Sequence, residues 1–163
     1  MSLFSAFRSV VDFQRKFCLP VGKAPQLLPH APHSDTNAIL ARASLFDAEQ
    51  SLKKLRTTHP DDQLYGRIQM MIEELREFMD AAKEDDIELM ADSLVDLEYF
   101  TLGTSAMMGL PHDEIFAEVH RANMDKILVS SAEESRRLNK LDVRKPVGWR
   151  PPNLKAILFP QEV

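Results

Sequence analysis

Cysteine is almost absent from this sequence, since Cys18 is the only one among 163 residues. A single cysteine excludes an internal disulfide framework and fits a reducing compartment. We expect Cys18 to be a small buried residue. The chain also has no run of about 18 apolar residues and no long apolar stretch at its N-terminus, which argues against a membrane span and a secretion signal. These absences predict a cytoplasmic protein with no membrane partner.

Concentrated positive charge is also missing. The net charge is −5, and the basic residues form nothing larger than short pairs such as Lys53-Lys54 and Arg136-Arg137. We therefore expect no nucleic-acid partner, because binding to a phosphate backbone requires clustered Lys and Arg. A Gly-rich phosphate loop and a Glu-x-x-His pair are absent too, which weighs against P-loop and di-iron proteins. An acidic protein of this kind would need metal ions to bind a polyphosphate.

No segment alternates long enough between apolar and polar residues to build a sheet. Apolar residues recur instead at helical spacing, and Pro, Ser and Asp residues mark the helix ends. With 44% hydrophobic residues, the chain predicts one domain over residues 1–163, an all-α bundle of four to five main helices. The two acidic helices described next are expected between Asp61-Asp62 and the turn Glu84-Asp85-Asp86, and between that turn and Gly109. The other expected helices, two of them short, span about 3–18, 34–56, 111–127, a turn after Ser131, and 154–159.

Carboxylates border the core in the first of the two acidic helices. At about 100° per residue, its apolar residues form one stripe. Glu74 lies at the edge of this stripe, Glu77 follows at i+3, and Glu73 falls further round the helix. The stripe consists of Leu64, Ile68, Met71, Ile72, Leu75, Phe78, Met79 and Ala82.

The second acidic helix is apolar around nearly its whole circumference, which predicts a buried helix. Its polar residues nevertheless cluster, because Asp92 and Asp96 are one turn apart with Ser93 beside them. Glu98 is alone on the opposite side. Buried carboxylates that face one another need a cation.

Two helices that supply acidic side chains to a shared interior predict an all-oxygen metal site, suited to Mg²⁺ or Mn²⁺. Such sites typically serve phosphoryl transfer, where the metal neutralises a polyphosphate and lowers the pKa of an attacking water. The alternative is that the Glu-Glu-x-x-Glu run is a solvated helix face. That alternative is strongest for Glu73 and weakest for Asp92 with Asp96.

Two polar residues, Asn123 and Lys126, share a face with apolar residues on the expected helix 111–127. Buried polar groups need partners. Lys126 is expected either to pair with the acidic cluster or to bind a phosphate oxygen together with Asn123, and the second role is favoured. The only tryptophan, Trp149, either anchors the C-terminal tail by packing or stacks on a base, and packing is favoured.

Several motifs together resemble the all-α nucleoside triphosphate pyrophosphatases, which include MazG-like, phosphoribosyl-ATP pyrophosphohydrolase-like and dimeric dUTPase-like proteins. The resemblance implies a homodimer or dimer of dimers. It also implies Mg²⁺-dependent cleavage of a nucleoside triphosphate to the monophosphate and pyrophosphate. The motifs, in chain order, are Glu73-Glu74-x-x-Glu77, Asp92-x-x-x-Asp96-Leu97-x-Tyr99, the run from Phe116 to Lys126, and Gly148-Trp149-Arg150-Pro151-Pro152.

The same resemblance implies roles for the acidic residues. Glu74 and Glu77 correspond to the first pair of metal ligands, and Glu73 to an additional ligand or a base for water. Asp96 corresponds to the aspartate of the second pair. The family often has Glu three residues earlier, where this chain has Ser93, so Asp92 is the expected substitute.

An upstream segment, residues 42–49, faintly echoes the acidic motif. It is set aside because Asp47-Ala48-Glu49 lacks carboxylates at i and i+3. The leading hypothesis is a house-cleaning hydrolase that removes non-standard or surplus nucleotides. The rival hypothesis is a catalytically silent helical dimer that binds a nucleotide or a protein, its metal site degraded at Ser93.

Overall fold

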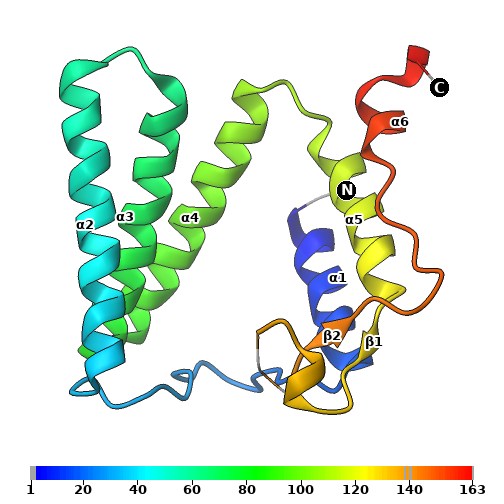
Figure 1. The fold of residues 1–163 in the computed structure, drawn as a ribbon, viewed down its shortest axis with the longest axis horizontal. Helices are drawn as coiled ribbons and strands as arrows, with labels where there is room; N and C mark the ends of the chain where they lie inside the picture. Colours follow the sequence, from blue (N-terminus) through cyan, green and yellow to red (C-terminus); the bar gives the residue numbers. More distant parts are fainter. Residues whose placement is uncertain (1–2, 138, 140, 163) are drawn as a thin grey trace. The chain divides into compact units, whose positions relative to one another are not determined.

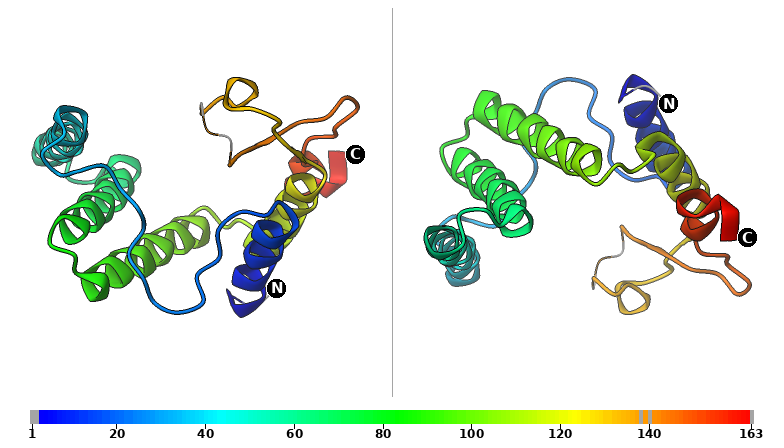
Figure 2. Two further views of the ribbon diagram at one scale, coloured as in Figure 1. Left: turned by 90° about the horizontal axis from the view of Figure 1, so that it is seen from below. Right: turned by 90° about the horizontal axis from the view of Figure 1, so that it is seen from above.

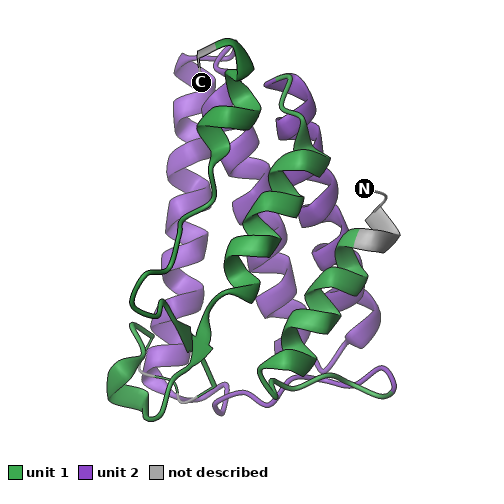
Figure 3. Cartoon of the chain, turned by 90° about the vertical axis from the view of Figure 1, so that its right-hand side faces the viewer, with its two compact units in different colours: residues 1–23, 109–163 green, residues 24–108 purple. Residues whose placement is uncertain are grey.

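The computed structural model describes residues 3–137, 139 and 141–162. The chain divides into two compact units (Figure 3): unit 1 contains residues 1–23 and 109–163, and unit 2 contains residues 24–108. The fold is mostly helical, which confirms the all-α prediction. One domain over residues 1–163 stays a prediction. Within the described residues, no helix has both the length and the apolar character needed to cross a membrane.

Unit 2 consists of three long helices, α2 (Thr36–Thr58), α3 (Gln63–Lys83) and α4 (Ile87–Met107). Each begins after an aspartate whose side chain accepts hydrogen bonds from backbone N–H groups of the first turn: Asp35, Asp62 and Asp86. In the views of Figures 1 and 2, α3 lies between α2 and α4, and it packs against both. The central position of α3 places its acidic motif between two neighbouring helices.

A tight turn joins α3 to α4. Asp85 adopts a positive φ of 55° in this turn, which short polar residues tolerate better than most. At the other end of the hairpin, Arg67 donates through Nε to Thr104 Oγ1 at 2.9 Å and through Nη2 to the Phe100 carbonyl at 2.5 Å. Gly103 makes room for this arginine, because a Cβ there would lie 2.9 Å from Arg67 Nη2. The turn and the arginine together set the register of the two helices.

The prediction of a fully buried second acidic helix is wrong for this structure. Leu94, Val95 and Tyr99 of α4 are 52%, 63% and 74% exposed. The helix packs mainly against α3, so it buries one face, through residues such as Met90 and Ser93. Apolar residues around a whole circumference therefore need more partners than unit 2 supplies.

Unit 1 contains α1 (Leu3–Lys16), α5 (His112–Met124), the short α6 (Leu154–Leu158) and two 3₁₀ turns, η1 (Ala132–Glu134) and η2 (Pro160–Glu162). Two strands of two residues each, β1 (Ile127–Leu128) and β2 (Val143–Arg144), pair antiparallel (Figure 1). Among the described residues this short ladder is the only sheet, consistent with the lack of strand periodicity. Within unit 1, α1 and α6 both pack against α5.

Three local expectations in unit 1 are wrong. The helix expected over 111–127 ends at Met124 with Asp125 as its cap, so Lys126 lies beyond it and Ile127 enters a strand. Ser131 forms no side-chain cap for η1. Cys18 is exposed, because α1 ends at Lys16 and the chain turns there with a φ of 50° at the cysteine.

The C-terminal tail is fastened to α5 by side chains. Trp149 donates through Nε1 to the Ala122 carbonyl at 2.7 Å, and Lys145 Nζ lies 4.3 Å from the centre of its ring. Glu118 accepts hydrogen bonds from the Arg121 guanidinium and from the backbone N–H of Asn153 at 2.9 Å. These contacts favour the packing role of Trp149 over base stacking.

Candidate functional site

The α3–α4 hairpin brings the two acidic motifs together. Glu74 and Asp96 are equally far along the chain from Asp85, at the turn, so an antiparallel pair of helices places them at the same level. Glu77 and Asp92 line one pocket of about 260 Å³. The acidic motifs of α3 and α4, which the turn at residues 84–86 separates in the sequence, therefore lie on one surface of unit 2.

Glu74 is the central carboxylate of this cluster. Its side chain is 9% exposed, and it forms no hydrogen bond or ion pair with the described residues. Burial raises the pKa of Glu74, and the negative charges of Glu77, Asp96, Glu73 and Asp92 raise it further. A buried carboxylate among like charges is unfavourable unless a cation joins it.

Asp92 and Asp96 are exposed on α4, whereas Ser93 is 5% exposed against α3. As these side chains stand, the described part of the chain has no group of three or more His, Cys, Asp or Glu placed to hold a metal ion. Asp92 and Asp96 nevertheless lie close enough to Glu74 for their charges to raise its pKa, and exposed side chains change rotamer on a fast timescale. The donor set is entirely oxygen, and together with the unpaired Glu74 carboxylate it fits a hard divalent cation.

The other two glutamates of the motif already have cationic neighbours. Lys53 Nζ lies 3.6 Å from Glu73 Oε1, and Arg76 Nη2 lies 3.2 Å from Glu77 Oε1. Arg76 also pairs with Asp80 at 2.7 Å. Glu73 is half-buried and Glu77 is exposed, so both keep one side open to solvent.

Sequence reasoning set Glu49 aside together with the weak acidic echo in residues 42–49. This residue of α2 is 1% exposed and accepts hydrogen bonds from Lys53 Nζ and from Arg76 Nε, the latter at 2.6 Å. Burial alone would raise the pKa of Glu49, but these two cations outweigh it and the pKa is lowered. The available signal was helical spacing, since Glu49 follows Leu45 by four residues and precedes Leu52 by three, on the core face.

Lys126 and Asn123 belong to unit 1. Lys126 follows the end of α5, and its backbone N–H donates to the Asn123 carbonyl at 3.2 Å. Burial lowers the pKa of Lys126, and the positive charges of Arg137 and Lys145 lower it further. Within the described residues of unit 1, no carboxylate forms an ion pair with Lys126, and Asp142 acts on it only through its charge.

Comparison with known proteins identifies the family of the segment that contains the acidic motifs. A sequence model of the phosphoribosyl-ATP pyrophosphohydrolase family matches residues 44–123, which include Glu49, both acidic motifs and Asn123 but end before Lys126. No curated protein and no solved structure matches the chain significantly. The family has nucleotide pyrophosphohydrolase-type activity. Through residues 44–123, the chain belongs to the MazG-like and phosphoribosyl-ATP pyrophosphohydrolase superfamily of all-helical pyrophosphohydrolases.

Proposed function

We propose that this protein is a Mg²⁺-dependent nucleoside triphosphate pyrophosphohydrolase that releases a nucleoside monophosphate and pyrophosphate. The observation that carries the proposal is Glu74, a nearly buried carboxylate with a raised pKa and without a hydrogen-bond donor or cation among the described residues. Four further carboxylates raise its pKa. A divalent cation would relieve this repulsion, and its affinity for a triphosphate would recruit the substrate.

The residues proposed to hold the metal are Glu74, Glu77, Asp92 and Asp96. When bound, Mg²⁺ would neutralise the triphosphate and make water a better nucleophile. Mn²⁺ has similar ligand preferences and is expected to substitute. Glu73 is the candidate base that accepts the proton of the attacking water, and its ion pair with Lys53 at 3.6 Å would hold the carboxylate in place.

Lys126 and Asn123 are proposed to bind phosphate oxygens. A lysine without a carboxylate partner can offset the charge that grows on the departing pyrophosphate, and an amide can donate a further hydrogen bond. A role in removing non-standard or surplus nucleotides is the physiological part of the proposal.

A homodimer or dimer of dimers is also proposed. The exposed apolar side chains of α4 support it, because Leu94, Val95 and Tyr99 would lose water contact against a second helical surface. Light scattering of the purified protein at several concentrations tests this part. A mass equal to one chain throughout would contradict it.

The deciding experiment is pyrophosphate release from a panel of standard and modified nucleoside triphosphates, with Mg²⁺, with Mn²⁺ and with EDTA. We expect release that requires the metal, and a Glu74→Gln variant that loses it. The rival hypothesis, a catalytically silent dimer, predicts nucleotide binding without pyrophosphate release from any member of the panel. Absence of release from Glu74→Gln excludes contaminating phosphatases. Asp47→Asn, which changes an exposed acid on α2 and is prepared in parallel, should release pyrophosphate as the parent does.

A further inference from the structure

A pocket of about 380 Å³ in unit 1 is lined by residues of the β1–β2 ladder and its neighbours. Figure 1 shows where this ladder lies along the chain. Lys126 precedes β1 and enters the pocket from the end of α5, while Arg144 comes from β2. The connection between the strands, residues 129–142, adds Arg136 and Arg137, and Lys145 follows β2. The pairing of Ile127 with Arg144 and of Leu128 with Val143 brings these three segments to one place. The fold thus gathers cations that the sequence distributes over 20 residues.

The charges in this pocket do not balance. Its two acids are already engaged: Glu134 accepts from Arg144 Nε at 3.0 Å, and Asp142 accepts from Arg137 Nη1 at 2.7 Å. Asp142 also accepts from Ser135 Oγ at 2.7 Å. Among the described residues, no carboxylate pairs with the remaining three cations, which are Lys126, Arg136 and Lys145.

The positive charges around Lys126 affect its pKa. Burial lowers the pKa of its ammonium, and the charges of Arg137 and Lys145 lower it further, against the weaker opposing effect of Asp142. Lys145 is held by the Trp149 ring, with its Nζ 4.3 Å from the ring centre. A cation held by an aromatic ring keeps its N–H donors available for an anion.

We propose that this pocket binds the polyphosphate chain of a small molecule. Its volume lies within the range of about 300–1,000 Å³ typical of small-molecule sites. Three uncompensated cations match an anion that carries several charges, and Arg and Lys are the side chains that recognise phosphate oxygens. That the bound molecule is the nucleotide substrate rests on the proposed function, whereas the binding of polyphosphate does not.

The test uses inorganic tripolyphosphate as the probe and the full-length protein in EDTA. Because Trp149 is the only tryptophan and contacts Lys145, its fluorescence reports on the pocket. We expect saturable binding by fluorescence and by calorimetry, with an affinity that falls as salt rises. A nucleoside triphosphate should compete, and the corresponding nucleoside, which lacks phosphate, should not. Absence of saturable binding at low salt would overturn the proposal.

Two variants and a matched control locate the binding site. Arg136→Gln and Lys145→Gln should each weaken tripolyphosphate binding by about tenfold, the usual loss for one charge-assisted hydrogen bond. Arg136 is exposed and forms no interaction with the described residues, so its replacement should not disturb folding. Lys23→Gln removes an equal charge from unit 1 outside the pocket and should bind as the parent does. Equal affinities for all three variants would overturn the assignment.

The outcomes separate this inference from the proposed function. Glu74→Gln in EDTA should bind tripolyphosphate as tightly as the parent, although it should not release pyrophosphate. Binding without release from any nucleotide would contradict the proposed function and leave the pocket standing. Pyrophosphate release without tripolyphosphate binding would contradict the pocket and leave the proposed function standing. A short DNA oligonucleotide that binds more tightly than tripolyphosphate, and loses affinity in Arg136→Gln, would overturn the choice of a small molecule.

Discussion

Glu49 of α2 accepts a hydrogen bond at 2.6 Å from Nε of Arg76, which lies inside the acidic motif of α3. The same guanidinium contacts Glu77 at 3.2 Å and Asp80 at 2.7 Å. One arginine therefore connects a buried acid of a neighbouring helix to a proposed metal ligand. Glu49, which lies outside the Glu73–Glu77 motif, thus fixes the position of Arg76, the only cation inside that motif.

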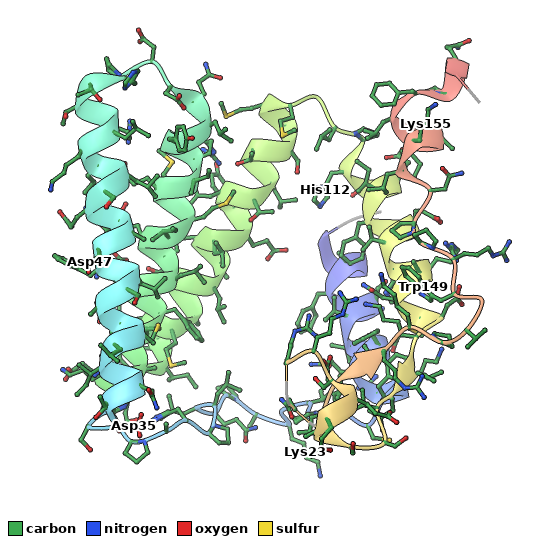
Figure 4. All side chains as sticks on the ribbon, viewed as in Figure 1. Lys23, Asp35, Asp47, His112, Trp149 and Lys155 are labelled. Atoms are coloured by element: carbon green, nitrogen blue, oxygen red, sulfur yellow. The ribbon has the colours of Figure 1, made fainter. Side chains whose placement is uncertain are left out.

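Glu49→Gln should lower the free energy of unfolding by about 2 kcal/mol at pH 7, because it leaves the charges of Arg76 and Lys53 without their buried partner. The value lies below that for a fully buried pair, since the Arg76 and Lys53 side chains are 24% and 43% exposed. Urea denaturation measures it. The control is Asp47→Asn on the outer side of α2 (Figure 4), which should change stability by less than about 0.5 kcal/mol.

The same comparison has a defined pH dependence. The pKa of Glu49 is lower in the folded than in the unfolded chain, so its stabilisation is present above the unfolded pKa of 4.5 and is lost as pH falls through the folded pKa. The difference between parent and Glu49→Gln should accordingly shrink on acidification from pH 7. A difference that grew in acid would contradict the ion pair.

Glu74→Gln should reduce pyrophosphate release by at least about a hundredfold, because it removes the central carboxylate of the proposed metal site. The fold should be retained or slightly stabilised at pH 7. Because the pKa of Glu74 is raised in the folded chain, its charged form opposes folding. The contribution of Glu74 to the free energy of unfolding is therefore most favourable below pH 4.5 and is lost as pH rises through the folded pKa.

Thermal melts with and without Mg²⁺ check this second effect. The metal should raise the melting temperature of the parent protein more than that of Glu74→Gln, since ligand binding to the folded state stabilises it. Near-parental turnover of Glu74→Gln at saturating Mg²⁺ would exclude this residue as a ligand.

Asp92→Asn should cost far more activity than Ser93→Ala and should raise the Mg²⁺ concentration that gives half-maximal rate. Asp92 and Ser93 both line the pocket of unit 2 that contains Glu77, but Asp92 is exposed, whereas Ser93 is 5% exposed and too short to replace a glutamate. Mg²⁺ titrations of the rate measure both effects. Equal and small changes would make Asp92 a structural residue, and restored activity in Asp92→Asn, Ser93→Glu would show that the site accepts a carboxylate from either position.

Lys126→Met should raise the KM for nucleotide and lower kcat while thermal stability stays the same or rises. The lysine has no carboxylate partner among the described residues and is repelled by Arg137 and Lys145, so losing its charge costs the fold little. Asn123→Ala should have a smaller effect of the same kind. Steady-state kinetics and melting curves decide, and a less stable Lys126→Met with unchanged kinetics would favour a structural salt bridge.

Acid should release the C-terminal tail from α5. Hydrogen bonds from Arg121 and from the Asn153 N–H lower the pKa of Glu118 to about 2. The contribution of Glu118 to the stability of the folded chain is present above the usual pKa of 4.5 and is lost as pH falls towards about 2. The Trp149 fluorescence should change over this range in the parent, and Glu118→Gln should lack that part of the change at an unchanged helical content.

Much of this protein follows from the sequence alone. Aspartates before apolar periodic stretches place the starts of α2, α3 and α4, because their side chains cap backbone N–H groups locally. The spacing of Glu73, Glu74 and Glu77, and of Asp92 and Asp96, sets which face each carboxylate takes on its helix. Motif order then led to the family that the comparison with known proteins supports.

Tertiary structure decided what helical periodicity does not contain. Periodicity gives the face of Glu49 but not its partner, and only the packing of α2 on α3 brings Arg76 to it. The helix containing Asn123 ends before Lys126 because Asp125 caps it and Ile127 pairs with Arg144, a contact distant in sequence. That pairing also assembles Lys126, Arg136 and Lys145 around one pocket, although no linear stretch of the chain forms a basic cluster.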